Sequence, residues 1–235
     1  MNIFSIINNN KIFFFESKHM SSIVESFNKI NSNIEKLKPI QRVNIVAVSK
    51  TFSFDHIKPL LDYGHNHFGE NKVQEAISKW RQIKKDRENL QLHMIGKLQS
   101  NKAKNAALLF DYIHSLDNQK LADILSNFEN ENGKNLKYFI QVNIGNEGQK
   151  SGIPVNEVEP FYNYCTNEKN LNILGLMVLP PNDDNTKKYF QTLNQLNKSI
   201  GLKELSMGMS SDYEEAIKYN ATYLRIGSSI FGSRN

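Results

Sequence analysis

The chain has 235 residues, of which 39% are hydrophobic and 23% charged, a balance typical of a folded globular protein rather than a disordered one. The formal net charge of +5 is modest and the lysines are spread along the chain, which argues against nucleic-acid binding and is compatible with a small anionic ligand. The single cysteine, Cys165, excludes a disulfide within the chain and favours a reducing compartment, the cytoplasm.

The first 19 residues differ from the rest of the chain. The run Phe13–Phe15 looks like part of a signal peptide, but no basic segment precedes it, Asn8–Asn10 interrupt the apolar stretch and no cleavage site follows. Nothing in the sequence reaches the roughly 20 apolar residues that a transmembrane helix needs. We therefore expect residues 1–19 to be a poorly ordered extension, or translation to start at Met20, and residues 20–235 to form one domain without a membrane association.

From residue 21 onwards, helical and extended patterns alternate. Residues 21–37 carry apolar side chains at Ile23, Phe27, Ile30 and Ile34, the spacing of a helix with one buried stripe, and Pro39 ends it. We expect strands at 43–48, 67–69, 92–96, 112–116, 138–144, 173–179, 204–207 and 223–227. Further helices are expected at 54–63, 72–85, 102–109, 118–128, 155–166, 186–200 and 213–219.

This alternation predicts the fold class. Strands separated by helices form parallel sheets with right-handed crossovers, and eight such units in a chain of this length favour a single (β/α)8 barrel of the TIM type, here with an additional N-terminal helix. A doubly wound open sheet is the alternative. The glycine-rich turn typical of dinucleotide-binding sheets is absent after the first strand, which favours the barrel.

Active sites of such barrels lie at the carboxyl ends of the strands. Lys50 ends an apolar strand, where burial would lower the pKa of its amine and make it a nucleophile towards aldehydes, although an ordinary lysine at a strand end is the simpler interpretation. The loops 207–212 and 225–229 offer small residues, hydroxyls and backbone N–H groups that suit a phosphate, although Ser210 and Asp212 also suit helix capping. Together these features indicate a phosphorylated aldehyde or sugar.

An ordered set of motifs carries a more specific signal. They are VNIVAVSKT at 43–51, HFGENKVQEA at 67–76, HMIGKLQSNKAK at 93–104, IHSLD at 113–117, QVNIGNEGQKSGI at 141–153, GLM at 175–177, LSMGMSSDYEEAI at 205–217 and LRIGSSIFGSR at 224–234. In this order the chain resembles the pyridoxal phosphate homeostasis proteins, a barrel family similar to the N-terminal domain of bacterial alanine racemase. Lys72 and Lys97 depart from the residues usual in that family, outside the positions that bind the cofactor.

The resemblance implies a site for pyridoxal 5'-phosphate (PLP), bound covalently to Lys50 as a Schiff base. By the same resemblance, Arg225 faces the pyridine nitrogen, and because a guanidinium keeps its proton, the ring nitrogen would stay unprotonated and the cofactor would be a weak electron sink. The remaining residues that the resemblance assigns are Ser210, Gly227 and Ser228 at the phosphate, with Asn71 and Met177 lining the pocket. For Met177, simple packing is the alternative.

Two functions follow from the resemblance. Racemisation needs an acid or base on each face of the substrate, and the resembling racemases take the second one from a further domain, whereas this sequence ends at Asn235, just after the last strand. His67, His93 and His114 are candidate local bases, but each lies in or beside a strand, where a structural role is commoner. We therefore expect a noncatalytic monomer that stores, buffers or delivers PLP to apo enzymes, with an amino-acid racemase as the alternative.

Overall fold

Eight parallel strands form a closed barrel in the computed structural model, which describes residues 7–8, 11–12, 21–145, 148, 151–181 and 183–233. These strands are β3 (Asn44–Val48), β4 (His67–Glu70), β5 (Gln91–Met94), β6 (Tyr112–Leu116), β7 (Lys137–Asn143), β9 (Asn172–Met177), β10 (Glu204–Ser206) and β11 (Tyr223–Ile226). The barrel closes because β11 pairs with β3 and β6 pairs with both β5 and β7. The predicted (β/α)8 barrel is confirmed, and the open-sheet alternative is wrong.

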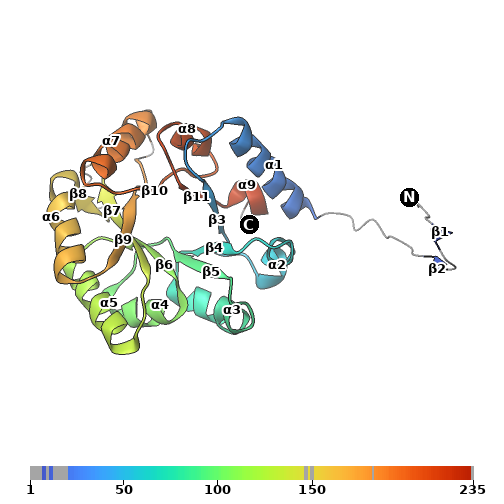
Figure 1. The fold of residues 1–235 in the computed structure, drawn as a ribbon, viewed down its shortest axis with the longest axis horizontal. Coiled ribbons are helices and arrows are strands. Elements are labelled where there is room, and N and C mark those ends of the chain that lie inside the picture. Colours follow the sequence, from blue (N-terminus) through green and yellow to red (C-terminus); the bar gives the residue numbers. More distant parts are fainter. Residues whose placement is uncertain are drawn as a thin grey trace.

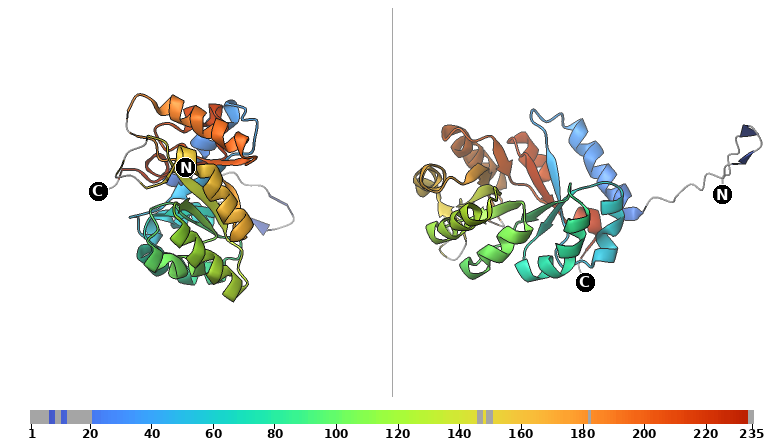
Figure 2. Two further views of the ribbon diagram at one scale, coloured as in Figure 1. Left: turned by 90° about the vertical axis from the view of Figure 1, so that its left-hand side faces the viewer. Right: turned by 60° about the horizontal axis from the view of Figure 1, so that its bottom comes forward.

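Helices surround this barrel on the outside, as Figure 1 and the two further views in Figure 2 show. The α-helices are α1 (Ser22–Lys36), α2 (Phe54–Asp62), α3 (Val73–Asp86), α4 (Ala103–Leu109), α5 (Gln119–Asn132), α6 (Val158–Asn163), α7 (Thr186–Ser199), α8 (Tyr213–Lys218) and α9 (Ser228–Phe231). Three short segments of other helix types join them: η1 (Ser100–Lys102), η2 (Val155–Glu157) and the π-helical η3 (Tyr164–Glu168).

Helix α1 is the predicted additional helix. Ser21 caps it, because the Ser21 hydroxyl accepts a hydrogen bond from the Val24 N–H at 3.4 Å. Its buried stripe includes Phe27, Ile30 and Ile34, as the spacing predicts, and it packs against α2 and α9. The helix therefore covers the side of the barrel where the first and last strands meet.

Two apolar layers fill the molecule. The larger one lies between the strands and the helices and contains Ile57, Phe68, Trp80 and Cys165, whose burial raises the pKa of its thiol to about 12. The smaller one lies inside the barrel and consists of Val46, Val48, Ile95, Tyr112, Phe139, Met177 and Tyr223. Successive strand residues point to opposite sides of the wall, so strands such as β3 are apolar on both faces.

The structure differs from the predicted elements in two places. The single helix predicted at 155–166 is divided into η2, α6 and η3, and a short strand, β8 (Ile153–Pro154), precedes it and pairs with β7. Pro160 lies inside this segment and lacks the N–H that a regular helix would use, which accounts for its short α-helical part. The second difference is α9, a short helix directly after β11, where the sequence pattern predicts none.

Of the expected N-terminal extension, only two pairs of residues are described. They form β1 (Ile7–Asn8) and β2 (Lys11–Ile12), which pair in an antiparallel arrangement; the remainder of residues 1–19 lies outside the described part, and the expectation for it stays a prediction. Among the described helices, none combines the length and apolar character required to cross a bilayer.

Candidate functional site

A cavity of about 430 Å³ opens at the carboxyl end of the barrel strands. It is lined by Val48, Lys50, Asn71, Ile95, Gly96, Leu179, Met209, Ser210, Ser211, Arg225, Gly227 and Ser228. Of the residues predicted from the sequence, six share this cavity: Lys50, Asn71, Ser210, Arg225, Gly227 and Ser228. Apolar residues such as Ile95 and Leu179 were missed, because a hydrophobic side chain at a strand end carries no chemical signal in the sequence.

Lys50 stands at the cavity wall directly after β3. Strand β3 ends in the buried residues Ala47 and Val48, and the Ser49 N–H continues the pairing by donating to the Gly69 carbonyl at 3.0 Å. The side chain of Lys50 is half-buried. Its position gives an amine that is anchored by the barrel wall and reaches the cavity.

The loops after β10 and β11 form one side of the cavity and are joined to each other. The Ser210 hydroxyl accepts a hydrogen bond from the Ser229 N–H at 3.3 Å, and Gly208 has a φ of 91°, a conformation that glycine adopts without strain. Within the described residues, the N–H groups of Ser211, Gly227 and Ser228 make no hydrogen bond. These donors and hydroxyls are the groups that a phosphate requires.

Arg225 supplies a buried positive charge to the same cavity. It is 3% exposed, and its guanidinium donates to the Ser206 hydroxyl at 2.6 Å and to the Val178 carbonyl at 2.8 Å. Burial lowers its pKa to about 10, so it remains a cation at neutral pH. Both acceptors are neutral groups. A buried positive charge is costly unless a negative charge or an electron pair stabilises it, so the arrangement favours an anionic ligand or a lone pair next to Arg225.

A chain of histidines continues from Ser206 into the barrel. His114 Nδ1 lies 2.8 Å from the Ser206 hydroxyl, His93 Nδ1 lies 2.9 Å from His114 Nε2, and His67 Nδ1 lies 3.0 Å from His93 Nε2. The rings also stack on aromatic neighbours, with His93 4.1 Å from Tyr112 between ring centroids. The three candidate bases of the sequence analysis thus form one hydrogen-bonded chain beneath the cavity and do not line it.

The donor-only guanidinium favours one direction of hydrogen bonding along this chain. Arg225 can only donate to Ser206, which leaves the Ser206 hydroxyl proton free for His114 Nδ1; in that arrangement each ring carries its proton on Nε2 and donates it to the next Nδ1. Burial is the main cause that lowers the pKa of His93 and His114 well below the ordinary value, and it also lowers the pKa of His67. All three rings are therefore neutral at physiological pH.

Of the two residues predicted to line the pocket, Asn71 lines the cavity and Met177 does not. Asn71 lines the cavity and also a second one of about 370 Å³, to which Lys72, Lys97 and Lys102 contribute; the Asn71 Oδ1 atom is buried without a hydrogen-bond partner. Met177 is fully buried in the apolar layer inside the barrel and is not among the cavity-lining residues. Its contact with a cofactor therefore stays a prediction.

The donor set of the cavity fits PLP. An amine suits its aldehyde, N–H groups and hydroxyls suit its phosphate, and a buried guanidinium suits the lone pair of its ring nitrogen. Within the described residues, no three His, Cys, Asp or Glu side chains converge as metal ligands.

The fold and cavity together define a barrel of the alanine racemase N-terminal domain family: residues 26–235 match this family, and the chain belongs to it. More particularly, the chain belongs to the pyridoxal phosphate homeostasis proteins. The relative of that name from Haemophilus influenzae is 37% identical over 203 residues, which cover 82% of this chain and 86% of the relative. The one from Vibrio cholerae is 35% identical over 231 residues, which cover 92% and 98%. The predicted family is confirmed.

Solved structures agree with this assignment. PipY from Synechococcus elongatus with PLP bound is 32% identical with a TM-score of 0.80, and the alignment covers 90% of this chain and all of PipY. An alanine racemase from Clostridium difficile is 14% identical with a TM-score of 0.67, and the shared fold covers 57% of that enzyme. The barrel is thus common to proteins with and without additional domains.

Proposed function

We propose that this protein binds PLP in the cavity at the carboxyl end of the barrel and takes part in keeping the cofactor available in the cell. Lys50 holds it covalently as a Schiff base, and Arg225 donates to the ring nitrogen. The phosphate is held by Ser210, Gly227 and Ser228. The observation that carries the proposal is the meeting of three groups in one cavity: an anchored amine, a buried guanidinium whose hydrogen-bond acceptors are neutral, and N–H groups that make no hydrogen bond within the described residues. PLP bound to PipY supports it.

The role that we propose is storage, buffering or delivery of the cofactor, without robust catalysis. Among the described residues that line the cavity, the titratable side chains are Lys50 and Arg225. A racemase needs a second acid or base opposite the lysine, and Arg225 cannot serve, because it holds its proton at neutral pH. The three histidines lie beneath the cavity, where Ser206 separates them from Arg225. These features favour a carrier over an amino-acid racemase.

The first test is a visible spectrum of the protein with PLP, before and after reduction with borohydride, followed by mass spectrometry of the peptides. We expect absorbance of a Schiff base and a reduced adduct on Lys50, both lost in Lys50→Ala, since Lys50 is the one lysine among the described residues that line the cavity. An adduct confined to another lysine would overturn the assignment.

The second test addresses catalysis. Wild-type protein loaded with PLP should racemise or transaminate alanine and serine no faster than an equal concentration of free PLP. Sustained turnover above that background, and its loss in Lys50→Ala, would establish the racemase alternative instead.

The proposal also includes the recipients of the cofactor, the cellular compartment and the oligomeric state. We infer that apo PLP-dependent enzymes in the cytoplasm receive the cofactor from a monomeric carrier. A single buried cysteine with a raised thiol pKa agrees with a reducing compartment. Transfer of PLP from loaded protein to an apo enzyme, monitored through the activity gained, tests delivery, and light scattering tests the monomer.

A further inference from the structure

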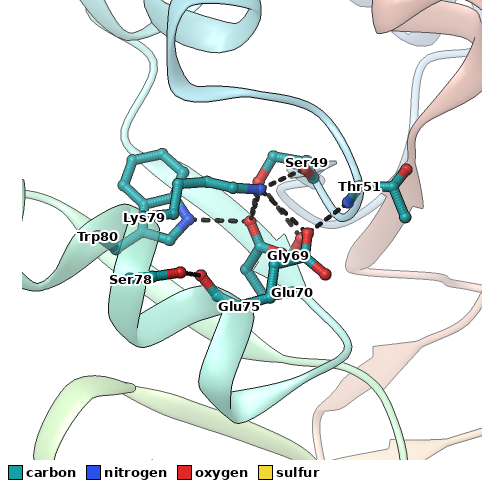
Figure 3. A network of polar contacts seen from close by, with 8 residues as sticks. All are labelled: Ser49, Thr51, Gly69, Glu70, Glu75, Ser78, Lys79 and Trp80. Atoms are coloured by element: carbon teal, nitrogen blue, oxygen red, sulfur yellow. Dashed lines mark hydrogen bonds and ion pairs between the residues drawn. The ribbon is translucent and has the colours of Figure 1, made fainter.

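We propose that Glu70, Glu75 and Lys79 are positioning residues for Lys50. They hold the backbone on both sides of this lysine, and so set the direction in which its amine enters the cavity. This inference rests on the proposed function, because it concerns how Lys50 meets the aldehyde of PLP. We name the three residues, together with Ser49 and Thr51, the Lys50 clamp (Figure 3).

On the N-terminal side of Lys50, the clamp grips Ser49. The ammonium of Lys79 donates to the Ser49 carbonyl at 2.8 Å, and the Ser49 hydroxyl donates to Glu70 Oε1 at 2.8 Å. Ser49 is fully buried, and the side chain of Lys79 is 7% exposed. Two charged groups, one from β4 and one from α3, therefore hold a residue that already belongs to the barrel wall.

On the C-terminal side, the clamp grips Thr51. The Thr51 N–H donates to Glu75 Oε1 at 2.5 Å, and Thr51 has a φ of 70°, in the left-handed region. A β-branched residue rarely adopts this conformation, because its side chain crowds the backbone there. A strained conformation persists only where the surroundings enforce it, and the Glu75 carboxylate is the group that grips this N–H.

The anchor of the clamp is the buried carboxylate of Glu70, which accepts hydrogen bonds through Oε1. Glu70 Oε1 also accepts from Lys79 at 2.9 Å and from the Trp80 indole N–H at 2.9 Å, and both Glu70 and Trp80 are fully buried. The Trp80 ring in turn packs on Phe68, 4.9 Å away between ring centroids. Since Glu70 belongs to β4 and Lys79 to α3, the clamp ties Lys50 to two neighbouring elements of the barrel.

Such a grip has a chemical purpose beyond stability. A lysine side chain has four rotatable bonds, and its amine must approach the aldehyde carbon in a defined orientation for the bond to form. Fixing the backbone before and after Lys50 removes two sources of misorientation. The clamp should therefore affect formation of the Schiff base more than it affects capture of the phosphate and the ring.

The test separates these two contributions with two ligands. Pyridoxamine 5'-phosphate has the phosphate and ring of PLP but an amine in place of the aldehyde, so it binds without forming the Schiff base. In Glu75→Ala, we expect PLP affinity to fall about tenfold, in line with the loss of a hydrogen bond to a charged group, and pyridoxamine 5'-phosphate affinity to stay within about twofold. Glu75 suits this test because it is partly exposed, whereas removing Lys79 would leave the buried carboxylate of Glu70 without its cation.

Three further variants complete the experiment. Glu75→Gln keeps an acceptor for the Thr51 N–H and should restore most of the PLP affinity. Thr51→Gly in the Glu75→Ala background should restore part of it, because glycine adopts the left-handed conformation without strain. Ser78→Ala removes a hydroxyl that bonds only to the Glu75 carbonyl within the same helix, and should change neither ligand's affinity.

The outcomes distinguish the clamp from the proposed function. If the wild type forms the Lys50 adduct and Glu75→Ala binds PLP as the wild type does, the clamp is overturned. Equal losses for both ligands also overturn it, because the residue would then support the cavity as a whole. A wild type that forms no adduct on Lys50 overturns the proposed function instead, whatever Glu75→Ala does.

Discussion

Ser206 links the Arg225 guanidinium to the His114 ring through its hydroxyl group. Its hydroxyl accepts from the Arg225 guanidinium at 2.6 Å and lies 2.8 Å from His114 Nδ1, and it is fully buried. A hydroxyl can accept and donate at once, which neither a carbonyl nor an amide N–H can do. Ser206 therefore connects the Arg225 guanidinium, a donor at the cavity, to the first ring of the histidine chain.

Ser206→Ala should lower the free energy of unfolding by about 1–3 kcal/mol, because Arg225 and His114 would each keep a buried polar atom without a partner. Urea unfolding measures the loss. Ring-nitrogen NMR of the wild type should show His67, His93 and His114 protonated on Nε2, and in Ser206→Ala the fixed tautomer of His114 should be lost.

Ser115→Ala is the matched control for Ser206→Ala. The Ser115 hydroxyl is also buried, but it has no hydrogen-bond partner, so its removal should leave stability unchanged or raise it slightly. Similar losses in the two variants would contradict the role assigned to Ser206.

At the same scale, the sequence identified much of the site and missed its connections. Lys50 and Arg225 were predicted because strand ends and family motifs place them, and both line the cavity. The histidine chain was not predicted, because it depends on the register of three neighbouring strands and on ring orientation. The Lys50 clamp was missed for the same reason, since Lys79 reads as an ordinary helix lysine.

The loops after β4 and β5 approach each other closely at Gly96. Gly96, in the loop after β5, lies against the loop after β4, and a Cβ on Gly96 would come within 2.5 Å of the Asn71 carbonyl oxygen and 2.8 Å of its Cα. Since these are backbone atoms, no side-chain rotation relieves the contact. The absence of a side chain at Gly96 therefore lets the two loops form a continuous cavity wall.

Gly96→Ala should push Asn71 out of place and lower PLP affinity about tenfold, a typical cost of inserting a methyl group into a packed site. Titration of the apo protein with PLP measures this, and the melting temperature reports whether the barrel itself is intact. Ser100→Ala, at the start of η1 four residues further on, adds no atom and should bind PLP normally. Unchanged affinity in Gly96→Ala would show that the loops can separate without consequence.

Element order was the most predictable aspect of the fold. The alternation of extended and helical patterns of apolar residues indicated each of the eight barrel strands. The observed strand bounds differ from the predicted ones by a few residues at most. The division of the helix around Pro160 and the short α9 were not predicted, because both depend on local packing rather than on period. Closure through β11 and β3 is a contact between distant segments, which the count of units implied but no local pattern specified.

On the scale of the whole molecule, the buried histidines make stability depend on pH. Burial lowers the pKa of His65 to about 4 and also lowers those of His93 and His114. The unfolded chain binds protons at these residues below its ordinary pKa of about 6.5, whereas the folded chain does not. Stability should therefore be complete above about pH 6.5 and fall as the pH drops towards the folded pKa values.

Between about pH 7.5 and 5.5, we expect the free energy of unfolding to fall by about 4 kcal/mol for these three histidines together. Urea unfolding at the two pH values measures it. His65→Phe should remove about a third of the difference, which isolates the histidines from carboxylates such as Glu129, whose own pKa is raised by burial. Equal stability at both pH values would contradict the neutral histidine chain.

The one-way order of the histidine chain has an electrical consequence for Arg225. Each imidazole protonated on Nε2 has a dipole whose negative end, the Nδ1 lone pair, points back towards Ser206, so the three dipoles add head to tail. The guanidinium is thus stabilised by aligned dipoles, as an ion is at a helix terminus, in addition to the more distant charge of Asp212. Asp212 acts on Arg225 from a distance and raises its pKa, but no described carboxylate forms an ion pair with the guanidinium, so its field still reaches the cavity.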